Sequence, residues 1–299
     1  MSEVLTGSRL KNSQDESWFQ ETLHDGFRQS HQITSVLASK KTKFQDCQLL
    51  NTPVFGRMLV LDGVVQTTEK DEFVYHEMLT HIAMLTHPDP KRVLIIGAGD
   101  GGILREVLKY DVEQVTMVEI DADVIEFSKE HLPMICENAF EDKRAKVLVD
   151  DGAKFVEQTK EKFDVVLVDS PDPIGPAKVL FSEKFYNNVF NCLTADGVMA
   201  RQSGVPVLQG PELSDAVAVL KKVFPKVFVY LASIPTYIGG FFSFVFGSKT
   251  YDPTKLSLDA LKKKYEAVGL KSKYYNPEIH LAAFALPNFV KDLASKGGK

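Results

Sequence analysis

The sequence contains few cysteines and no long hydrophobic run. The three cysteines, Cys47, Cys136 and Cys192, lie far apart and form no C-x-x-C motif, so neither a disulfide framework nor a thiolate metal site is predicted. No apolar run approaches the roughly 18 residues of a transmembrane helix. The first residues resemble neither a signal peptide nor a transit peptide. We therefore expect a cytoplasmic protein without a membrane partner.

Basic residues are not in excess either. The formal net charge is −5, and the lysines and arginines form no basic cluster. This balance argues against nucleic acid and anionic membranes as partners. The 299 residues, 44% of them hydrophobic, can bury a large core, and the length favours one large domain with a small one.

Glycine is concentrated in one turn, at residues 97–102. Residues 93–96 are aliphatic and predict a strand buried on both faces of a parallel sheet. Gly97, Gly99 and Gly102 fit the pattern G-x-G-x-x-G, and Glu119 ends the next apolar strand at the distance where an acid binds ribose hydroxyls. The pattern fits a dinucleotide, a nucleoside such as S-adenosylmethionine, or a turn that needs glycine only for its backbone.

Asp100, inside this turn, favours one class of ligand. A carboxylate that points inward would repel the pyrophosphate of a dinucleotide, which binds to backbone N–H groups at such a turn. A cationic ligand suits it better. The alternative is that Asp100 turns outward and caps the following helix.

The order of the periodic segments predicts two domains after a tail. Residues 1–17 are polar and predict a loose tail, and residues 18–70 form short alternating segments with a hairpin signal at Asp62-Gly63. Residues 71–86 have the apolar period of a helix. His76 and His81 in this helix are five residues apart, not the four of H-E-x-x-H. We therefore predict no metal site.

From the glycine turn onward, strands and helices alternate. This alternation predicts an α/β fold, with a parallel sheet, right-handed crossovers and helices on both faces, over residues 71–299. A late strand pair, residues 226–231 and 241–247, is expected to be antiparallel.

Carboxylates follow successive strands of this sheet, where ligands of such folds bind. They are Asp100, Glu119 with Asp121, Asp150 with Asp151, and Asp169 with Asp172. For Asp121 and Asp150, capping of the next helix is an equal alternative. Residues 169–176 contain three prolines and a glycine, which predict a stiff loop. Paired acids on a stiff loop favour catalysis, whereas a rigid connection with solvated acids is the alternative.

Residues 234–240 predict another loop near the ligand. Proline and paired glycines mark it. Tyr237 within it either closes over a ligand or packs with its hydroxyl bonded to backbone. The sequence alone favours neither.

Together these motifs resemble the family of polyamine aminopropyltransferases, and its spermidine synthases in particular. The segments that carry the resemblance are residues 21–25, 61–69, 71–78, 97–102, 172–176, 234–237 and 274–277. The resemblance implies a methyltransferase-like, Rossmann-like sheet preceded by a small antiparallel β domain. It also implies transfer of an aminopropyl group from decarboxylated S-adenosylmethionine to putrescine, without a cofactor, by a homodimer or homotetramer.

The resemblance also implies roles for particular residues. Asp169 is the proton acceptor, and Asp100 binds the ammonium of the aminopropyl group. The residues assigned to the nucleoside are Gln45, Glu119 (ribose), Asp151 (adenine amino group), Gly152 and Pro176. The residues assigned to the diamine are Gln66, Tyr75, His76, Asp172 and Tyr237.

Three positions depart from the family pattern. Ala98 replaces a glycine of many members, Pro171 replaces a small hydroxyl residue, and some relatives have glutamine at the position of His76. None of the three removes a charged catalytic group, but together they leave the choice of acceptor open.

The reaction suits these residue types. A sulfonium has a good leaving group, so the enzyme mainly aligns the reacting atoms. The amine, with a pKa near ~10, must first lose a proton, and a desolvated carboxylate can accept it. Three alternatives remain: an S-adenosylmethionine-dependent N-methyltransferase acting on a diamine, a nicotinamide-dependent oxidoreductase, and a polyamine-binding module without turnover.

Overall fold

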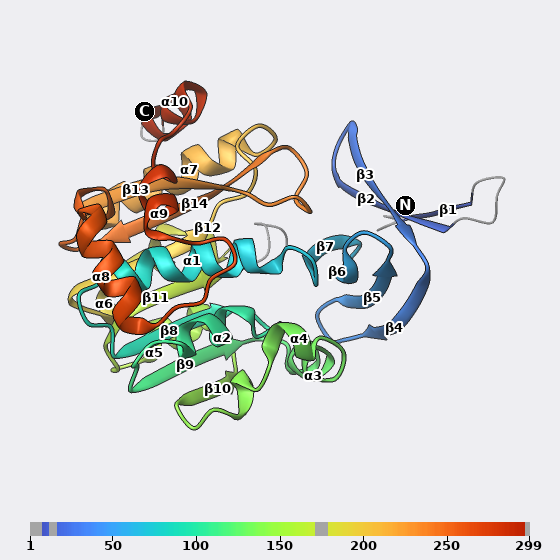
Figure 1. Cartoon of the computed structure of the whole chain (residues 1–299), viewed down its shortest axis with the longest axis horizontal. Helices are drawn as coiled ribbons and strands as arrows, with labels where there is room; N and C mark the ends of the chain where they lie inside the picture. The colour runs from blue at the N-terminus through green and yellow to red at the C-terminus, as the bar shows by residue number, and fades with distance from the viewer. Residues whose placement is uncertain (1–7, 12–16, 171–178, 297–299) are drawn as a thin grey trace.

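The computed structural model describes residues 8–11, 17–170 and 179–296. In Figure 1 the N-terminal strands form a small β unit beside a larger α/β part that holds the C-terminus. Within the described residues, no helix is long and apolar enough to cross a membrane. The predictions for Pro171, Asp172 and Pro176 concern residues 171–178, which lie outside the described part.

The small β unit contains two antiparallel sheets. The first comprises β1 (Ser8–Lys11), β2 (Ser17–His24) and β3 (Phe27–Ile33), and the second comprises β4 (Ser35–Lys41), β5 (Asp46–Thr52), β6 (Gly56–Leu61) and β7 (Val64–Thr68). The predicted hairpin joins β6 to β7, and both Asp62 and Gly63 have positive φ, as a type I′ turn requires. Strand β1 and Ser17, the first residue of β2, lie within the predicted loose tail. That prediction was wrong for these five residues, because β1 and β2 supply each other with backbone partners.

The larger part is built on a seven-stranded sheet in the order β10-β9-β8-β11-β12-β14-β13. Its parallel strands are β8 (Arg92–Gly97), β9 (Gln114–Glu119), β10 (Ala145–Val149), β11 (Phe163–Asp169) and β12 (Leu193–Gln202). The last two strands, β13 (Lys226–Ser233) and β14 (Phe241–Ser248), are antiparallel, as expected. The predicted α/β fold with a preceding antiparallel β domain is therefore confirmed.

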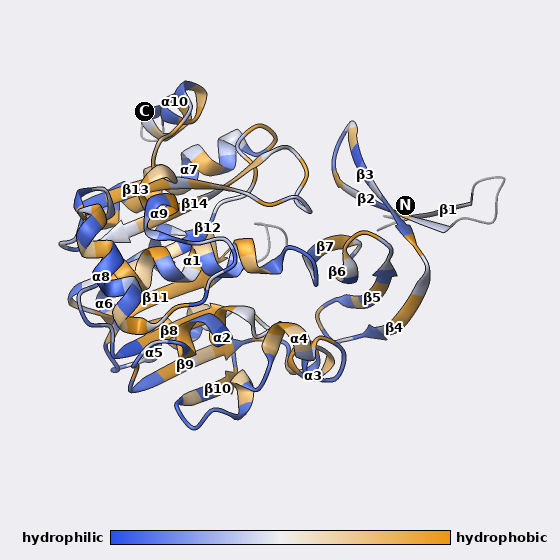
Figure 2. Cartoon of the chain, in the orientation of Figure 1, coloured by the Kyte–Doolittle hydropathy of each residue, from blue (hydrophilic) through white to orange (hydrophobic). Residues whose placement is uncertain are grey.

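Helices cover both faces of this sheet. The first face packs on α1 (Glu72–Thr86), α2 (Gly102–Leu108), α8 (Leu258–Val268) and α9 (Pro277–Ala282), and the second on α5 (Gly152–Gln158), α6 (Glu183–Cys192), α7 (Gly210–Val223) and α10 (Asn288–Lys296). Alternate residues of β8 enter the two cores, with Ile95 on the first face and Ile96 on the second. Figure 2 shows the resulting concentration of hydrophobic residues in the central strands.

The small β unit is anchored to the edge of the sheet where the parallel strands end. Cys47 of β5 and Leu59 of β6 pack in one cluster with Phe127 of α3 (Ala122–His131) and Ile135 of α4 (Pro133–Cys136). Burial of such side chains contributes roughly 25 cal/mol per Å² of apolar surface. Because α3 directly follows the end of β9, where ligands of such sheets bind, the small β unit lies beside the predicted ligand site.

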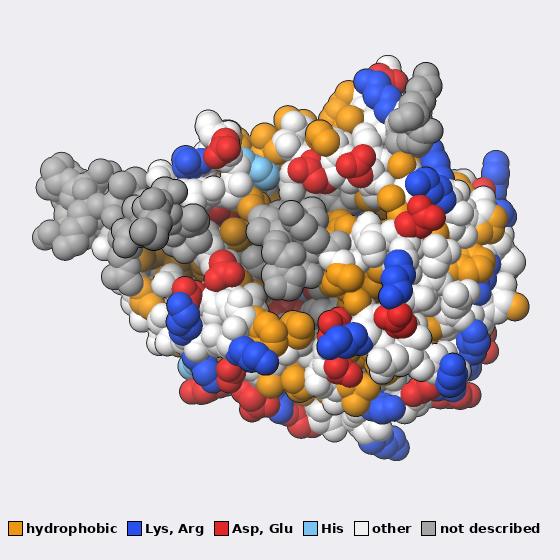
Figure 3. Space-filling model, turned by 180° about the vertical axis from the view of Figure 1, so that it is seen from behind, with side chains coloured by type: hydrophobic (Ala, Val, Ile, Leu, Met, Phe, Trp, Pro, Cys, Tyr) orange, Lys and Arg blue, Asp and Glu red, His pale blue; other side chains and the backbone are white. Residues whose placement is uncertain are grey.

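The surface carries both signs of charge. Figure 3 shows lysine and arginine side chains interspersed with aspartate and glutamate over one face of the molecule. The same mixture is expected from a chain with 35 basic and 40 acidic residues.

Candidate active site

The glycine turn brings the ends of β8 and β11 into close contact. Gly97 has φ +85°, and a Cβ atom there would lie 1.9 Å from the backbone oxygen of Asp169. A Cβ at Gly102 would lie 2.2 Å from Cε1 of His76. Both glycines are therefore required by close approach, the first also by its left-handed backbone.

Asp100 points inward and already has a cationic neighbour. Its Oδ2 lies 3.1 Å from Nε2 of His76, and its Oδ1 accepts the backbone N–H of Gly102 at 2.9 Å. Burial would raise the pKa of Asp100, but the His76 charge and the Gly102 N–H lower it below its usual value. Asp100 therefore does not turn outward, although it does bond the start of α2. Its cationic neighbour is a side chain of the protein itself, so the binding of a cationic ligand stays a prediction.

His76 is buried between two carboxylates. Its Nδ1 lies 2.6 Å from Oε2 of Glu72, one turn earlier on α1, and Asp100 lies at its other nitrogen. Burial would lower the pKa of His76, but Asp100 and Glu72 together raise it to about 10. His76 is therefore an imidazolium at neutral pH, with only 2% of its side chain exposed.

Asp169 ends β11 beside this pair. Burial and the nearby charge of Asp100 raise the pKa of Asp169 to about 6, although a hydrogen bond from Tyr75 and the charge of His76 oppose the rise. The Tyr75 hydroxyl donates that hydrogen bond directly to Oδ1 of Asp169. Asp169 is thus a half-buried carboxylate that is ionised at neutral pH and protonated a little below it.

Glu119 and Asp121, after β9, form a second group of acids. Burial raises the pKa of Glu119 to about 7, and its Oε1 accepts the backbone N–H of Asp121 at 2.9 Å. Asp121 caps α3 and also accepts hydrogen bonds from Thr42 at 2.6 Å and from the Gln45 amide at 3.1 Å. Gln45 of the small β unit therefore lies beside Asp121, and the capping interpretation holds for Asp121.

Asp151 and Gly152 begin α5 after β10. Asp151 caps the helix, accepting the backbone N–H of Ala153 at 2.9 Å. The capping expected of Asp150 is therefore performed by its neighbour, because Asp150 instead accepts the backbone N–H of Asp151. A Cβ at Gly152 would lie 2.5 Å from Ile96, so the helix starts in close contact with the sheet.

Tyr237 packs against Tyr75. The two ring centroids are 6.0 Å apart, and the Tyr237 hydroxyl donates to the backbone oxygen of Gln66. The Gln66 side chain itself donates to the backbone oxygen of Val64 at 3.2 Å. Of the two alternatives for Tyr237, the structure contains the hydroxyl bonded to backbone.

Several residues at the site were missed from the sequence. Asp71 accepts hydrogen bonds from the Thr68 hydroxyl at 2.6 Å and from the Thr236 backbone at 2.7 Å, joining β7 to the loop that carries Tyr237. Glu72 contacts His76, and Arg105 in turn donates a hydrogen bond to Glu72. The spacing of Glu72 and His76, four residues apart on one helix, was the only available signal.

Metal ligands do not cluster in the described part of the chain. No group of three His, Cys, Asp or Glu side chains there is arranged to hold a metal ion. What the site does contain is several buried carboxylates, one imidazolium and two tyrosines at the carboxyl edge of a parallel sheet.

Comparison with known proteins gives the family of the chain. Residues 72–257 match the model of the spermine/spermidine synthase domain, and residues 17–69 match the spermidine synthase tetramerisation domain. The chain belongs to the spermine/spermidine synthase family. The resemblance drawn from the sequence, and with it the expected enzyme class of aminopropyltransferases, is therefore confirmed.

Relatives cover nearly the whole chain. It is 50% identical to the polyamine aminopropyltransferase of Ruegeria sp. (strain TM1040) and 46% identical to that of Pseudomonas syringae pv. tomato, over 93% of this chain and 98% of each relative. A spermidine synthase crystallised with the transition-state analogue AdoDATO superposes with a TM-score of 0.89 at 40% identity, covering 93% of this chain and 94% of that one. The spermidine synthase of Thermotoga maritima gives 0.85 at 38% identity, with the same coverage.

Proposed function

We propose that this protein transfers the aminopropyl group of decarboxylated S-adenosylmethionine to putrescine, giving spermidine and methylthioadenosine. The observation that carries the proposal is Asp100: a carboxylate with 11% of its side chain exposed, and with its pKa lowered, occupies the glycine turn. Such a turn is unsuited to a pyrophosphate and suited to a ligand with an ammonium group. The nucleotide cofactor of an oxidoreductase is disfavoured for the same reason.

In the proposed reaction one amine of the diamine attacks the aminopropyl carbon attached to sulfur. A nitrogen–carbon bond forms, the carbon–sulfur bond breaks, and the sulfonium leaves as the neutral thioether of methylthioadenosine. Alignment of nitrogen, carbon and sulfur supplies most of the acceleration. The chemistry requires no cofactor, since the donor is itself a co-substrate.

Asp169 is the proposed proton acceptor. A protonated amine has no lone pair, so one proton must leave before or during attack. Asp169 is ionised at neutral pH, and its raised pKa of about 6 makes it a better base than an exposed aspartate. Tyr75 holds the carboxylate in place through its hydrogen bond.

Donor and acceptor occupy opposite parts of the proposed site. Glu119 would bind the ribose hydroxyls and Asp151 the adenine amino group, with Gln45, Gly152 and Pro176 beside them. Gln66, Tyr75, His76, Asp172 and Tyr237 would line the diamine channel. Burial of Glu119 and the direct Gln45–Asp121 contact support the nucleoside side.

Asp100 would also select the donor. The ammonium of decarboxylated S-adenosylmethionine is attracted to its carboxylate, whereas ordinary S-adenosylmethionine would bring a second carboxylate close to it. That repulsion excludes the commoner nucleoside. The preference for the decarboxylated donor also distinguishes the proposed activity from its main alternative, an N-methyltransferase, which would use ordinary S-adenosylmethionine.

A product assay tests the proposal. Purified protein is given putrescine with decarboxylated or ordinary S-adenosylmethionine, and methylthioadenosine, S-adenosylhomocysteine and spermidine are quantified. Equimolar methylthioadenosine and spermidine, from the decarboxylated donor alone, is the expected result. S-adenosylhomocysteine from the ordinary donor would establish a methyltransferase, and binding without products would establish a polyamine-binding module.

The quaternary structure forms part of the proposal. The match of residues 17–69 to a tetramerisation domain supports a homo-oligomer, a dimer or a tetramer. Light scattering after size-exclusion chromatography distinguishes these from a monomer of 33.4 kDa. A cytoplasmic location stays a prediction from the sequence.

A further inference from the structure

A second layer of charged side chains lies behind His76, away from the reacting groups. We propose that Glu72 and Arg105 are positioning residues, which hold His76 as a cation against Asp100 and thereby keep Asp169 available as a base. The first half of this inference concerns the protein alone. The second half rests on the proposed function.

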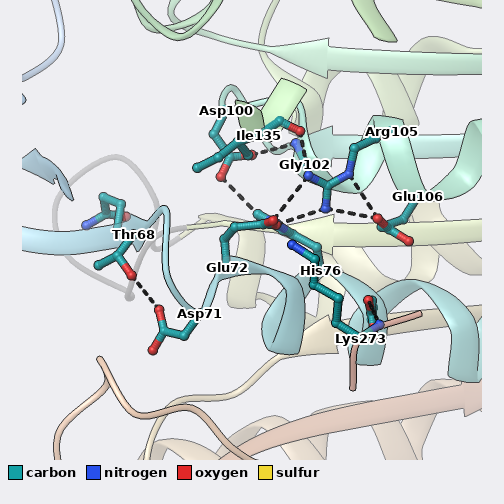
Figure 4. Close-up of polar contacts among 12 residues, drawn as sticks. Thr68, Asp71, Glu72, His76, Asp100, Gly102, Arg105, Glu106, Ile135 and Lys273 are labelled. Atoms are coloured by element: carbon teal, nitrogen blue, oxygen red, sulfur yellow. Dashed lines mark hydrogen bonds and ion pairs between the residues drawn. The ribbon is translucent and has the colours of Figure 1, made fainter. Parts of the chain in front are cut away.

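Glu72 is held from two sides. One side is the contact of 2.6 Å with His76. On the other, Arg105 of α2 donates from Nη2 to Oε2 of Glu72 at 2.9 Å and from Nη1 to Oε1 at 3.2 Å. Figure 4 shows the guanidinium and the carboxylate facing each other, with His76 and Asp100 beyond them. A two-pronged contact of this kind fixes the orientation of the carboxylate as well as its charge.

Arg105 is fixed in turn by its remaining contacts. It donates from Nη1 to the backbone oxygen of Ile135 at 2.7 Å and from Nε to Oε1 of Glu106 at 2.9 Å. Glu106 is fully buried and pairs with Lys109 at 2.6 Å. The charges therefore alternate in sign through contacting side chains, in the order Asp100, His76, Glu72, Arg105, Glu106 and Lys109. Lys109 lies at the surface. A buried network in which every charge has a partner of this kind is rigid.

The contacts of His76 select its protonated form. A neutral imidazole has one N–H and one lone pair, so one of its nitrogens would direct a lone pair at a carboxylate. With Glu72 at Nδ1 and Asp100 at Nε2, only the imidazolium donates to both. The other charged groups around it are Arg105 of α2, which lies behind Glu72, and Asp169 of β11, while the neutral Tyr75 ring packs beside it.

The charge of His76 affects the pKa of Asp169, the proposed base. The negative charge of Asp100 raises the pKa of Asp169, and the positive charge of His76 lowers it. If His76 were neutral, the uncompensated Asp100 would leave Asp169 protonated over a wider pH range. Glu72, whose described side-chain contacts are with His76 and Arg105, would then influence the reaction through His76.

The variant Glu72→Gln tests the inference, because it preserves the shape of the side chain and removes its charge. The first readout is the nitrogen NMR spectrum of histidine-labelled, unliganded protein. In the wild type we expect both nitrogens of His76 to be protonated at pH 8. In the variant we expect His76 to be neutral down to pH 6, the region in which Asp169 titrates, so that its charge no longer lowers the pKa of Asp169. The acidic limb of kcat/KM for the diamine should move to higher pH.

A matched control comes from the same helix. Glu77 is a buried carboxylate of α1 that accepts the backbone N–H groups of Lys273, Tyr274 and Tyr275, each at 2.8 Å. The variant Glu77→Gln loses a buried charge without touching His76. It should lower thermal stability, leave the His76 spectrum unchanged and leave the pH profile unmoved.

The variant Arg105→Gln keeps the inference testable if Glu72→Gln does not fold. Glu72 then stays charged beside His76 but loses its two-pronged support. The imidazolium signal should persist, and kcat should fall at every pH without a shift of the acidic limb. The inference is overturned if His76 is neutral at pH 8 in the wild type, or if Glu72→Gln reproduces the wild-type spectrum. A His76 spectrum as expected in a protein that forms no methylthioadenosine would instead overturn the proposed function alone.

Discussion

Asp100 and Asp169 lie at the ends of neighbouring strands, yet their surroundings shift the pKa values of the two carboxylates in opposite directions. The surroundings of Asp100 consist of an imidazolium and a backbone N–H, and they lower its pKa. Burial and the charge of Asp100 raise the pKa of Asp169 to about 6, although the Tyr75 hydroxyl and the charge of His76 oppose the rise. Burial is common to both. The nearest charged neighbour decides which acid stays a fixed anion and which serves as a base.

The largest effect is expected from Asp169→Asn. The amide cannot accept the proton of the attacking amine, so kcat should fall by about 10²–10⁴-fold, the range of general-base contributions. Binding of methylthioadenosine, measured by calorimetry, should be retained because the nucleoside residues are untouched. Turnover near that of the wild type would remove Asp169 from the role of base.

The variant Asp100→Asn should have the next largest effect, on the donor. Loss of a charge-assisted contact worth about 1.5–3 kcal/mol should raise KM for decarboxylated S-adenosylmethionine roughly 10- to 100-fold. Discrimination against ordinary S-adenosylmethionine should weaken, since the repulsion is gone. Competition experiments with the two nucleosides measure this ratio, and an unchanged ratio would contradict the role given to Asp100.

The variant Tyr75→Phe tests how the hydrogen bond from Tyr75 affects the pKa of Asp169. The hydrogen bond from Tyr75 lowers the pKa of this carboxyl, so its loss should move the acidic limb of kcat/KM above pH 6. At neutral pH we expect a decrease of up to about tenfold in kcat, in keeping with one lost hydrogen bond. A fall in kcat without any movement of the limb would mean that Tyr75 only packs against the substrate.

Tyr237→Phe should have the smallest effect. Its hydroxyl bonds the backbone of Gln66 and not a carboxylate, so the free energy of unfolding should fall by about 1 kcal/mol with the pH profile unchanged. Urea denaturation monitored by circular dichroism gives the stability change. A shift in the pH profile would show that Tyr237 acts on Asp169 directly.

The fold was largely predictable because it follows from local patterns. The apolar period of residues 71–86 predicted α1, and the aliphatic run before Gly97 predicted the central strand β8. The alternation of strands and helices after Gly97 predicted the parallel sheet. The structure contains all three. Strand β1 was missed because its sequence is polar. Helices α8, α9 and α10 were also not predicted, although α8 begins at a capping serine and ends at a left-handed glycine.

The candidate site was predictable only in part. Acids that follow parallel strands must meet at one edge, so Asp100, Glu119 and Asp169 could be grouped from the sequence. The contacts that set their charge join distant segments: Arg105 reaches Glu72 from another helix, and Asp71 bonds Thr236 across 165 positions. No local period encodes such contacts. His76 was therefore assigned to the diamine by resemblance, while its own two carboxylates were overlooked.

The most direct measurement is the pH dependence of kcat/KM for putrescine, in the wild type and in Asp100→Asn. Below its pKa, Asp169 is protonated and cannot accept a proton. Wild-type kcat/KM should therefore fall about tenfold per unit below pH 6. In Asp100→Asn the charge that raises the pKa is absent, while His76 keeps Glu72 as its anion, so the limb should move to lower pH. A limb that stays in place, or moves upward, would contradict the account.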